Sequence, residues 1–263
     1  ELNKQLASLL PEEKFRITVR DEIQHGITGI RADVEIRSEP HHHRHLSTIR
    51  TIIANSTLPE EVKTAAVAVF TRLAEAEAKV HGTTPEHVHF HEVGAIDSIV
   101  DIAGCCLALH LLGIKQVHVA PLPLGCGTVE CAHGVLPVPV PATVELLKGM
   151  KSYITAEPFE LVTPTGAALL ADWHADRLPV GRLITSACGY GKRQLQTRPN
   201  LLRALLFETD DIAVPETPSD CLVLECNIDD CQPEILGGVF NQLLAAGMAD
   251  VFAQPVLMKK QRQ

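Results

Sequence analysis

Apolar and polar residues alternate along two segments near the beginning of the chain. Phe15, Ile17 and Val19 alternate with polar residues, and residues 30–36 repeat the same pattern. A period of two residues is typical of a strand with one buried and one exposed face. We therefore predict two strands that form a hairpin through residues 24–29.

The next part of the chain repeats its apolar residues with the period of an α-helix. A short helix is predicted after residues 38–45, with Ser47 as its cap. A longer helix is predicted to begin near Pro59 and to end at Gly82. Its apolar stripe consists of Val62, Ala66, Val69, Phe70, Leu73 and Val80.

The remaining segments predict a mixture of helices and strands. Residues 121–141 are dense in proline and glycine, which excludes an ordinary helix or a central strand there. Residues 209–220 have the composition of a linker. The predicted elements are strands at 87–91, 117–119, 222–226 and 251–258, a helix that starts after Gly94 and ends at Gly113, and helices at 142–147, 167–173 and 233–246.

These elements predict an α+β fold in two parts. Residues 1–210 are expected to form a main mixed α/β domain, and residues 211–263 a linker plus a partial ferredoxin-like unit. The strand-helix-strand pattern of the second part is half of a ferredoxin-like domain. Because a sheet of two strands is marginal alone, this end is expected to pair with the main domain, another subunit or a further C-terminal segment.

The composition narrows the class of function. A net charge of −9 at pH 7 argues against nucleic acid as a partner, since phosphate backbones are bound by basic surfaces. No apolar run is long enough to span a bilayer, and no secretory signal pattern is found. We therefore expect a cytoplasmic protein without a membrane partner. The 8 cysteines form no CxxC pair and are expected to be free thiols.

A histidine-rich segment followed by paired aspartates is the strongest candidate site. Three imidazoles alternate along the predicted strand and share one face, and two carboxylates four residues apart share a face of the following helix. With an adjacent glutamate, these groups suit a metal or proton-transfer site. The alternative is a half-exposed strand beside a helix with two solvated acids. The residues concerned are His87, His89, His91, Glu92, Asp97 and Asp101.

A second histidine cluster lies in a polar loop and consists of His41, His42, His43 and His45. Neutral imidazole binds nickel, copper and zinc. Four histidines within five residues cannot all reach one ion from a rigid strand, but a loop can use two or three of them to take up and release a metal. A solvated linker of biased composition is the alternative.

Two further segments offer groups for an anionic ligand. Gly125 and Gly127 provide flexible backbone near His133, although an isolated GxG is a weak phosphate-loop signal. Thr163 and Thr165 lie at a predicted helix N-terminus, where backbone N–H groups favour anions. Helix capping explains these threonines equally well.

An acidic turn near the end of the chain is a candidate site for a hard cation. Asp229 and Asp230 place carboxylates between a predicted strand and a predicted helix. Such oxygen ligands suit magnesium or manganese. An acidic helix N-terminus is also stabilised by the helix dipole without a metal.

Taken together, these segments resemble the LarC family, whose members insert nickel during synthesis of the nickel-pincer nucleotide cofactor. The matches occur in order from about Phe15 to Lys260, so the resemblance covers nearly the whole chain. The blocks that carry it are residues 89–102, the glycine and proline blocks within 125–143, residues 163–170, and residues 227–230 with 258–260.

The resemblance implies a nickel-inserting cyclometallase, an enzyme of the lyase or chelatase type. Its substrates would be nickel(II) and pyridinium-3,5-bisthiocarboxylic acid mononucleotide, and the complete protein would use CTP with manganese or magnesium. Forming a nickel–carbon bond removes a ring proton, which requires a base. We assign catalysis to His89, His91, Glu92, Asp97, Asp101 and His133, and substrate binding to Gly125, Gly127, Thr163 and Thr165. We assign metal binding to His41, His42, His43, His45, His87, His89, His91, Asp229 and Asp230.

Compared with the family, the chain is expected to begin inside the first helix and to stop before a C-terminal portion that holds much of the CTP site. The expected partners are therefore the nucleotide substrate and that portion, in a longer form or in trans, with a homo-oligomer left open. Two other function classes remain. One is a nickel carrier or store without catalysis, and the other is a metal-dependent phosphate-ester hydrolase that uses the same clusters.

Overall fold

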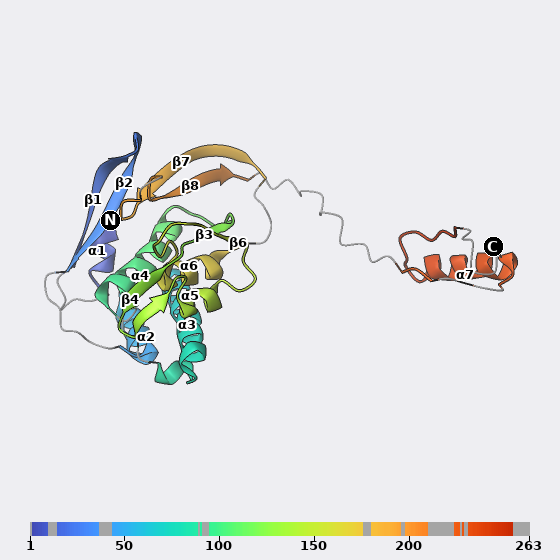
Figure 1. Ribbon diagram of the computed structural model, residues 1–263, viewed down its shortest axis with the longest axis horizontal. Coiled ribbons are helices and arrows are strands. Elements are labelled where there is room, and N and C mark those ends of the chain that lie inside the picture. Colours follow the sequence, from blue (N-terminus) through green and yellow to red (C-terminus); the bar gives the residue numbers. More distant parts are fainter. Residues whose placement is uncertain are drawn as a thin grey trace. The chain divides into compact units, whose positions relative to one another are not determined.

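The chain divides into two compact units, Glu1–Ile212 and Ala213–Gln263. The computed structural model describes residues 2–9, 15–36, 44–88, 90, 95–175, 180–195, 198–209, 224–226, 228 and 231–254. Its helices and mixed sheets confirm the predicted α+β fold. Figure 1 labels the elements of both units. None of the described helices combines the length and the apolar composition that crossing a membrane requires.

A four-stranded sheet in the order β1-β2-β7-β8 covers one side of the larger unit. Its first two strands, β1 (Phe15–Gln24) and β2 (Ile27–Ile36), form the predicted hairpin, and the turn uses His25 and Gly26 with positive φ angles of 49° and 78°. The strands β7 (Arg182–Tyr190) and β8 (Leu201–Glu208) form a second antiparallel hairpin. The sequence patterns did not predict this second hairpin.

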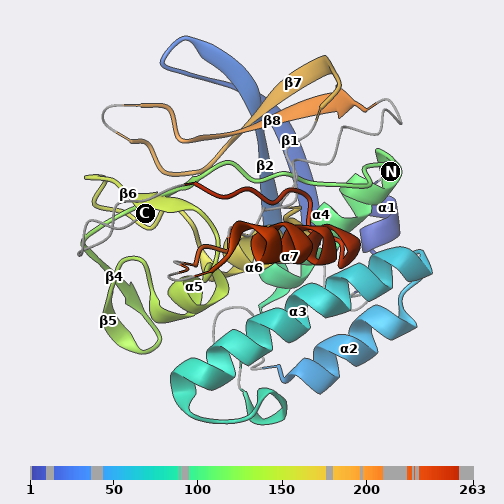
Figure 2. The same ribbon diagram turned by 90° about the vertical axis from the view of Figure 1, so that its right-hand side faces the viewer.

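The helices of the larger unit pack as a layer beneath the sheet, as Figures 1 and 2 show from two directions. Helix α3 (Glu60–His81) is central and contacts α2 (Leu46–Asn55), α4 (Ile96–Leu111), α5 (Pro141–Leu146) and α6 (Pro164–Trp173). The short helix α1 (Leu2–Leu6) contacts α4. The largest fully buried side chains include Leu6, Ile49, Ile53, Phe70, Leu73, Ile99, Ile102 and Leu107. Burying this apolar surface drives the packing of the layer.

The proline- and glycine-rich segment forms only short strands, as its composition predicts. Strand β3 (Leu122–Leu124) pairs in parallel with β6 (Ser152–Ile154). Strands β4 (Thr128–Cys131) and β5 (Gly134–Pro137) form a small hairpin. These strands do not extend the four-stranded sheet.

The predicted long helix is confirmed, including its end at Gly82, which adopts a left-handed φ of 64°. Val80 is 41% exposed and thus lies outside the apolar stripe assigned to it. The cap predicted for the preceding helix is wrong. His45 is the N-cap of α2, because its backbone is extended and its carbonyl accepts the N–H of Ile49. Ser47 lies inside the first turn.

The predicted strand at 87–91 is wrong at its first residue. His87 ends a short 3₁₀ helix, η1 (Pro85–His87), which Pro85 favours because its φ suits a helical first turn. Val88 and Phe90 are both 2% exposed, so these two apolar residues face the core. The predicted strand at 117–119 is reduced to an isolated bridge between Val117 and His174.

The second unit contains helix α7 (Pro233–Ala245), close to its predicted bounds. The described parts of the two predicted flanking strands, residues 224–226 and 251–254, are not in strands. A strand needs a neighbour for its backbone hydrogen bonds, and the described residues of this unit provide none. The remaining residues of both predicted strands, and most of the predicted linker, lie outside the described residues.

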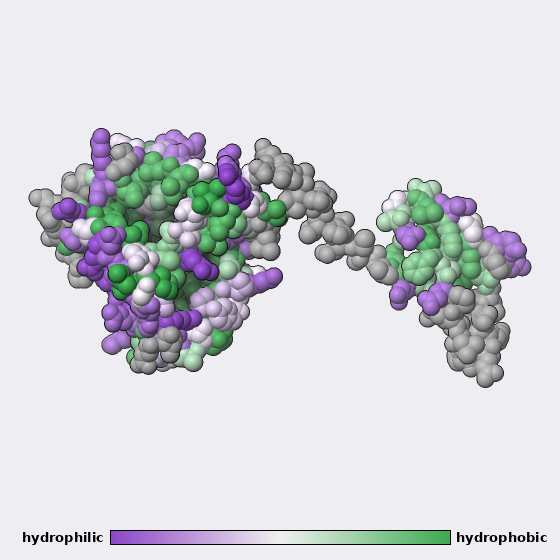
Figure 3. Space-filling view, turned by 90° about the horizontal axis from the view of Figure 1, so that it is seen from above, coloured by the Kyte–Doolittle hydropathy of each residue, from purple (hydrophilic) through white to green (hydrophobic). Residues whose placement is uncertain are grey.

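The four-stranded sheet has two chemically different faces. Residues opposite each other in the register share a face, and one face carries Val19, Ile23, Ile30, Leu202 and Leu206, which are all exposed. The other face carries charged residues of β1 and β2. Figure 3 shows the larger unit from above, the side on which the sheet lies, and hydrophobic residues gather there around a hollow in the surface.

Candidate functional site

Helix α4 presents the paired carboxylates that the sequence singled out. Asp97 lies in its first turn, and Asp101 follows one turn later. The pKa of the Asp101 carboxyl is raised from 3.8 to about 6, mainly by desolvation. The negative charge of Asp97 also raises this pKa, and the positive charge of Lys192 lowers it. Asp101 retains exposed surface. The two carboxylates therefore interact electrostatically, and the pKa of Asp101 lies closer to neutral pH than that of an ordinary aspartate.

The pairing between β2 and β7 is limited. These two strands pair in parallel at a single position, Ile30 opposite Gly189. Continuing the same register past the end of β7 brings Lys192 alongside Asp33, and their charged atoms are 3.9 Å apart. Lys192 thus interacts electrostatically with both Asp33 of the sheet and Asp101 of α4. The sequence patterns did not identify Lys192, because the hairpin that carries it was not predicted.

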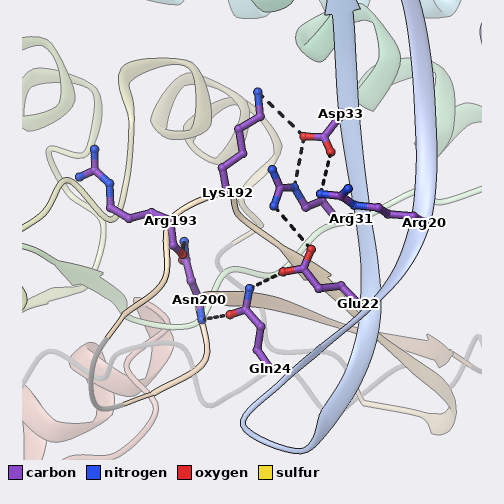
Figure 4. Close-up of polar contacts among 8 residues, drawn as sticks. All are labelled: Arg20, Glu22, Gln24, Arg31, Asp33, Lys192, Arg193 and Asn200. Carbon is purple, nitrogen blue, oxygen red and sulfur yellow. Dashed lines mark hydrogen bonds and ion pairs between the residues drawn. The ribbon is translucent and has the colours of Figure 1, made fainter.

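A charged network extends along β1 and β2 from this point (Figure 4). Asp33 accepts a hydrogen bond from Nε of Arg31 at 3.2 Å and lies 3.5 Å from Arg20. Arg31 also approaches Glu22 at 3.6 Å. The side chains of Arg31, Asp33 and Glu22 are less than 20% exposed. Partial burial strengthens these ion pairs relative to exposed ones, so the network holds Asp33 in place.

The predicted glycine loop packs tightly against a second loop. A Cβ atom on Gly125 would lie 1.6 Å from the carbonyl oxygen of Phe159, so only glycine fits at this position. The N–H of Cys126 donates to the carbonyl of Glu157 at 2.8 Å. Gly127 has a φ of 85° and is exposed. Contacts within the protein thus occupy the Cys126 N–H, and Gly127 remains at the surface.

Of the two threonines at the start of α6, Thr163 caps the helix. Thr163 is the N-cap, and its hydroxyl oxygen accepts the N–H of Gly166 at 3.2 Å. Thr165 lies within the first turn. This geometry agrees with the capping interpretation that the sequence left open, and substrate binding by either threonine remains a hypothesis.

His133 lies in the turn between β4 and β5, at the end of α3. Its ring is 4.7 Å from the ring of His81, measured between centroids. His81 in turn approaches Glu77 at 3.4 Å. His133 is therefore grouped with the end of α3, and its catalytic role stays a prediction.

The two histidine-rich segments meet through their backbones. Arg44 and Phe90 form an antiparallel bridge, in which the N–H of Phe90 donates to the carbonyl of Arg44 at 3.4 Å. His45 is the N-cap of α2, and Nδ1 of His87 lies 2.9 Å from the Thr84 hydroxyl. Arg44 and Phe90 are thus paired, although more than forty positions separate them in the sequence. His41, His42, His43, His89, His91, Glu92, Asp229 and Asp230 lie outside the described residues.

The described histidine, cysteine and acidic side chains form no preassembled metal site. Within the part of the chain that the structure describes, no group of three or more His, Cys, Asp or Glu side chains is arranged to hold a metal ion. Burial raises the pKa of the Cys106 thiol to about 12, which disfavours the thiolate that metals bind. Metal binding by the predicted histidines and by Asp229 and Asp230 stays a prediction.

Comparison with known proteins identifies relatives over almost the whole chain. A relative from Akkermansia muciniphila, named pyridinium-3,5-bisthiocarboxylic acid mononucleotide nickel insertion protein, is 43% identical over 99% of this chain and 66% of its own length. A relative from Geotalea uraniireducens, also named as a nickel insertion protein, is 47% identical over 99% of this chain and 67% of its own length. No solved structure shows significant similarity.

The chain therefore spans about two thirds of the length of these relatives. A family model described as nickel insertion protein matches residues 1–263. The relatives and the family model agree with each other and with the resemblance of the sequence motifs. This chain belongs to the nickel insertion protein family.

Proposed function

We propose that this chain takes part in inserting nickel(II) into pyridinium-3,5-bisthiocarboxylic acid mononucleotide to form the nickel-pincer nucleotide cofactor. The observation that carries the proposal is 43% identity, over 99% of the chain, to a relative named for this substrate. The reaction forms two nickel–sulfur bonds and one nickel–carbon bond, and the ring carbon loses a proton. In the terms of enzyme classification, this is a cyclometallase of the lyase type.

The adjoining histidine segments support nickel delivery. Imidazole binds nickel well, yet more loosely than a set of thiolates does, so the ion can move to the sulfur atoms of the substrate. The bridge between Arg44 and Phe90 brings the segments around them together. Nickel taken up by His41, His42, His43 and His45 is proposed to pass to His87, His89 and His91. Glu92 and His133 are proposed to assist as further proton acceptors.

Asp101 is proposed to accept the ring proton. An efficient general base has a pKa near the working pH, and the pKa of Asp101 is about 6. Asp97 contributes by raising that pKa through its negative charge. At neutral pH most Asp101 side chains are ionised and ready to accept a proton, while their raised pKa makes them stronger bases than an ordinary aspartate.

CTP and manganese or magnesium are assigned to the second unit and to a further C-terminal portion of a longer protein, acting in cis or in trans. Carboxylate oxygens suit both ions, and Asp229 and Asp230 are the proposed ligands. Both residues lie outside the described part of the chain. The assignment therefore rests on the chemistry of the carboxylate group.

The test is a nickel-transfer reaction followed by mass spectrometry of the nucleotide. The chain is incubated with nickel(II), the bisthiocarboxylic acid mononucleotide, CTP and magnesium, together with the C-terminal portion of a full-length relative. The expected product is the nickel-bound nucleotide. Asp101→Asn should slow its formation by about a hundredfold or more, the usual contribution of a general base.

Glu75→Gln is the matched control, because Glu75 is an exposed acid on the neighbouring helix α3. It should leave the rate unchanged. A chain that binds nickel but never transfers it under these conditions would support a carrier instead. Equal rates for Asp101→Asn and the unmodified chain would remove the proposed role of Asp101.

A further inference from the structure

The loop between β7 and β8 carries an unusual density of positive charge for an acidic protein. Lys192, Arg193 and Arg198 lie within seven positions in a chain of net charge −9. The structure describes residues 191–195 and 198 of this loop. We refer to residues 191–198 as the basic loop.

The part of the basic loop around Arg193 is held in place by hydrogen bonds to Asn200. The N–H of Gly191 donates to the carbonyl of Asn200 at 3.0 Å, and the Asn200 side chain donates to the carbonyl of Arg193 at 2.9 Å. The N–H of Asn200 donates to Oε1 of Gln24, a side chain in a residue only 8% exposed (Figure 4). Leu195 is buried and anchors the loop to the protein.

Gly191 makes this arrangement possible. A Cβ atom at that position would lie 2.6 Å from the Asn200 side-chain nitrogen. Any larger residue would therefore push Asn200 away from the loop that it supports. The backbone around Arg193 is accordingly preorganised before any ligand binds.

The three cations of the basic loop differ in what they contact. Lys192 pairs with Asp33 at 3.9 Å, and Arg198 pairs with Glu157 at 3.4 Å. The Arg193 guanidinium lies over the ring of Phe159, 4.7 Å from its centroid. Among the residues that the structure describes, no carboxylate pairs with the Arg193 guanidinium. Its N–H donors therefore remain available for a ligand.

The position of Arg193 links the basic loop to the glycine loop of the candidate site. Its guanidinium points away from the β1–β2 hairpin in Figure 4 and toward Phe159. The carbonyl of Phe159 is the group that packs against Gly125. The guanidinium lies over the ring of Phe159, and the backbone of Phe159 packs against the glycine loop. An anion beside the glycine loop would thus contact the guanidinium of Arg193.

A planar guanidinium with free donors binds phosphate or carboxylate oxygens in a bidentate manner. The substrate of the proposed function carries one phosphate monoester, which must be bound by a protein with a large negative net charge. We propose that Arg193 binds the phosphate monoester of a pyridinium mononucleotide, with Phe159 as the residue that positions it. This inference rests on the proposed function and adds a specificity-determining residue to it.

The test measures binding of nicotinic acid mononucleotide by calorimetry at low ionic strength. Arg193→Ala should weaken binding about tenfold or more, the usual effect of losing charge-assisted hydrogen bonds. Arg193→Lys keeps the charge but loses the bidentate geometry, so it should bind with intermediate affinity. Arg182→Ala is the matched control, because Arg182 is an exposed arginine at the opposite end of β7 that pairs with Glu208.

Nicotinic acid riboside, which lacks the phosphate, should bind the unmodified chain and Arg193→Ala equally weakly. Inorganic phosphate should bind less tightly than the mononucleotide, and a stronger response to phosphate would mark a free-anion site and overturn the proposal. Equal mononucleotide affinity in Arg193→Ala and the unmodified chain would also overturn it, as would the absence of mononucleotide binding by the unmodified chain.

Nickel transfer separates this inference from the proposed function. Arg193→Ala should raise the KM for the nucleotide about tenfold and leave kcat unchanged, because the phosphate is remote from the ring carbon that reacts. An unchanged KM in an active protein would refute the role of Arg193 while the proposed function stands. Failure of the unmodified chain to transfer nickel would count against the proposed function itself.

Discussion

Replacing Asp101 by asparagine should make the protein more stable near neutral pH. In the folded state the charged carboxylate is opposed by desolvation and by the negative charge of Asp97, which together raise its pKa from 3.8 to about 6. The neutral amide of asparagine avoids both effects. Residues that serve chemistry are often kept at a cost to stability, and Asp101 is the clearest instance in this chain.

The magnitude follows from the size of the pKa shift. One pKa unit corresponds to about 1.4 kcal/mol, so a shift from 3.8 to about 6 sets an upper limit of roughly 3 kcal/mol. Because Asp101 retains exposed surface, solvent screening reduces this limit, and we expect about 1 kcal/mol. The folded state binds the proton more tightly than the unfolded state. The cost of the charge is therefore absent below the unfolded pKa, grows as the pH rises toward about 6, and is constant above it.

The assay is urea unfolding of the unmodified chain and Asp101→Asn at about pH 4, 6 and 8. The free energy of unfolding of the variant should exceed that of the unmodified chain by about 1 kcal/mol at the highest pH, with a smaller difference at the lowest. Glu75→Gln should change stability by no more than a few tenths of a kcal/mol at any pH. A stability gain that is independent of pH, or no gain at the highest pH, would refute the reasoning.

Three further substitutions test local features of the fold by chemical denaturation. Gly125→Ala should destabilise the protein by roughly 3 kcal/mol, because the new Cβ would overlap the carbonyl oxygen of Phe159. Thr163→Ala should cost about 1 kcal/mol, since it removes the cap of α6, and Thr163→Ser should restore most of it. Tyr190→Phe should cost about 1 kcal/mol, because the Tyr190 hydroxyl donates to the carbonyl of Ile27 at 2.7 Å.

Gly134→Ala provides the comparison for the glycine prediction. Gly134 has a φ of 89°, but a Cβ atom added there would meet no other atom within 4 Å. Its substitution therefore adds backbone strain of about 1 kcal/mol without a clash. Equal losses at Gly125 and Gly134 would show that the contact with Phe159 is unimportant. A Thr163→Ser variant as unstable as Thr163→Ala would show that the hydroxyl does not cap α6.

Local patterns were sufficient to predict the first hairpin and the long helix. Phe15 and Ile17 alternate with polar residues because they pack against the core from one face of their strand. Gly82 ends α3 because it readily adopts a left-handed conformation. Such features depend on the residues within one element. The predicted cap of α2 was wrong because serine is a common N-cap residue and histidine is not. The choice of His45 over Ser47 depends on backbone geometry, which the sequence does not give.

The second hairpin was missed because its alternation is weak. Most residues of β7 are exposed, and Leu202, Leu205 and Leu206 of β8 are exposed as well. A strand without a clearly buried face gives little periodic signal. Missing this hairpin also concealed Lys192 and Arg193, whose roles depend on contacts with residues more than thirty positions away.

The sequence identified candidate residues of the site, but it did not predict the contacts between distant segments. The spacing of Asp97 and Asp101 correctly placed both on α4. The same reasoning could not predict that the segments of Arg44 and Phe90 pair, or that His133 lies beside His81. These contacts arise when distant segments pack, and local patterns carry no information about them.

Nickel delivery requires that the adjoining histidine segments bind nickel before it passes to a nucleotide. The decisive experiment is nickel titration by calorimetry, in which a variant with His89 and His91 replaced by alanine is compared with the unmodified chain. His110→Ala is the control, because His110 lies at the far end of α4 and pairs with Glu61. We expect stoichiometric nickel binding that weakens at least about tenfold in the double variant and is unchanged in the control. Identical titrations for the double variant and the unmodified chain, or no nickel binding by the unmodified chain, would contradict nickel delivery by these segments.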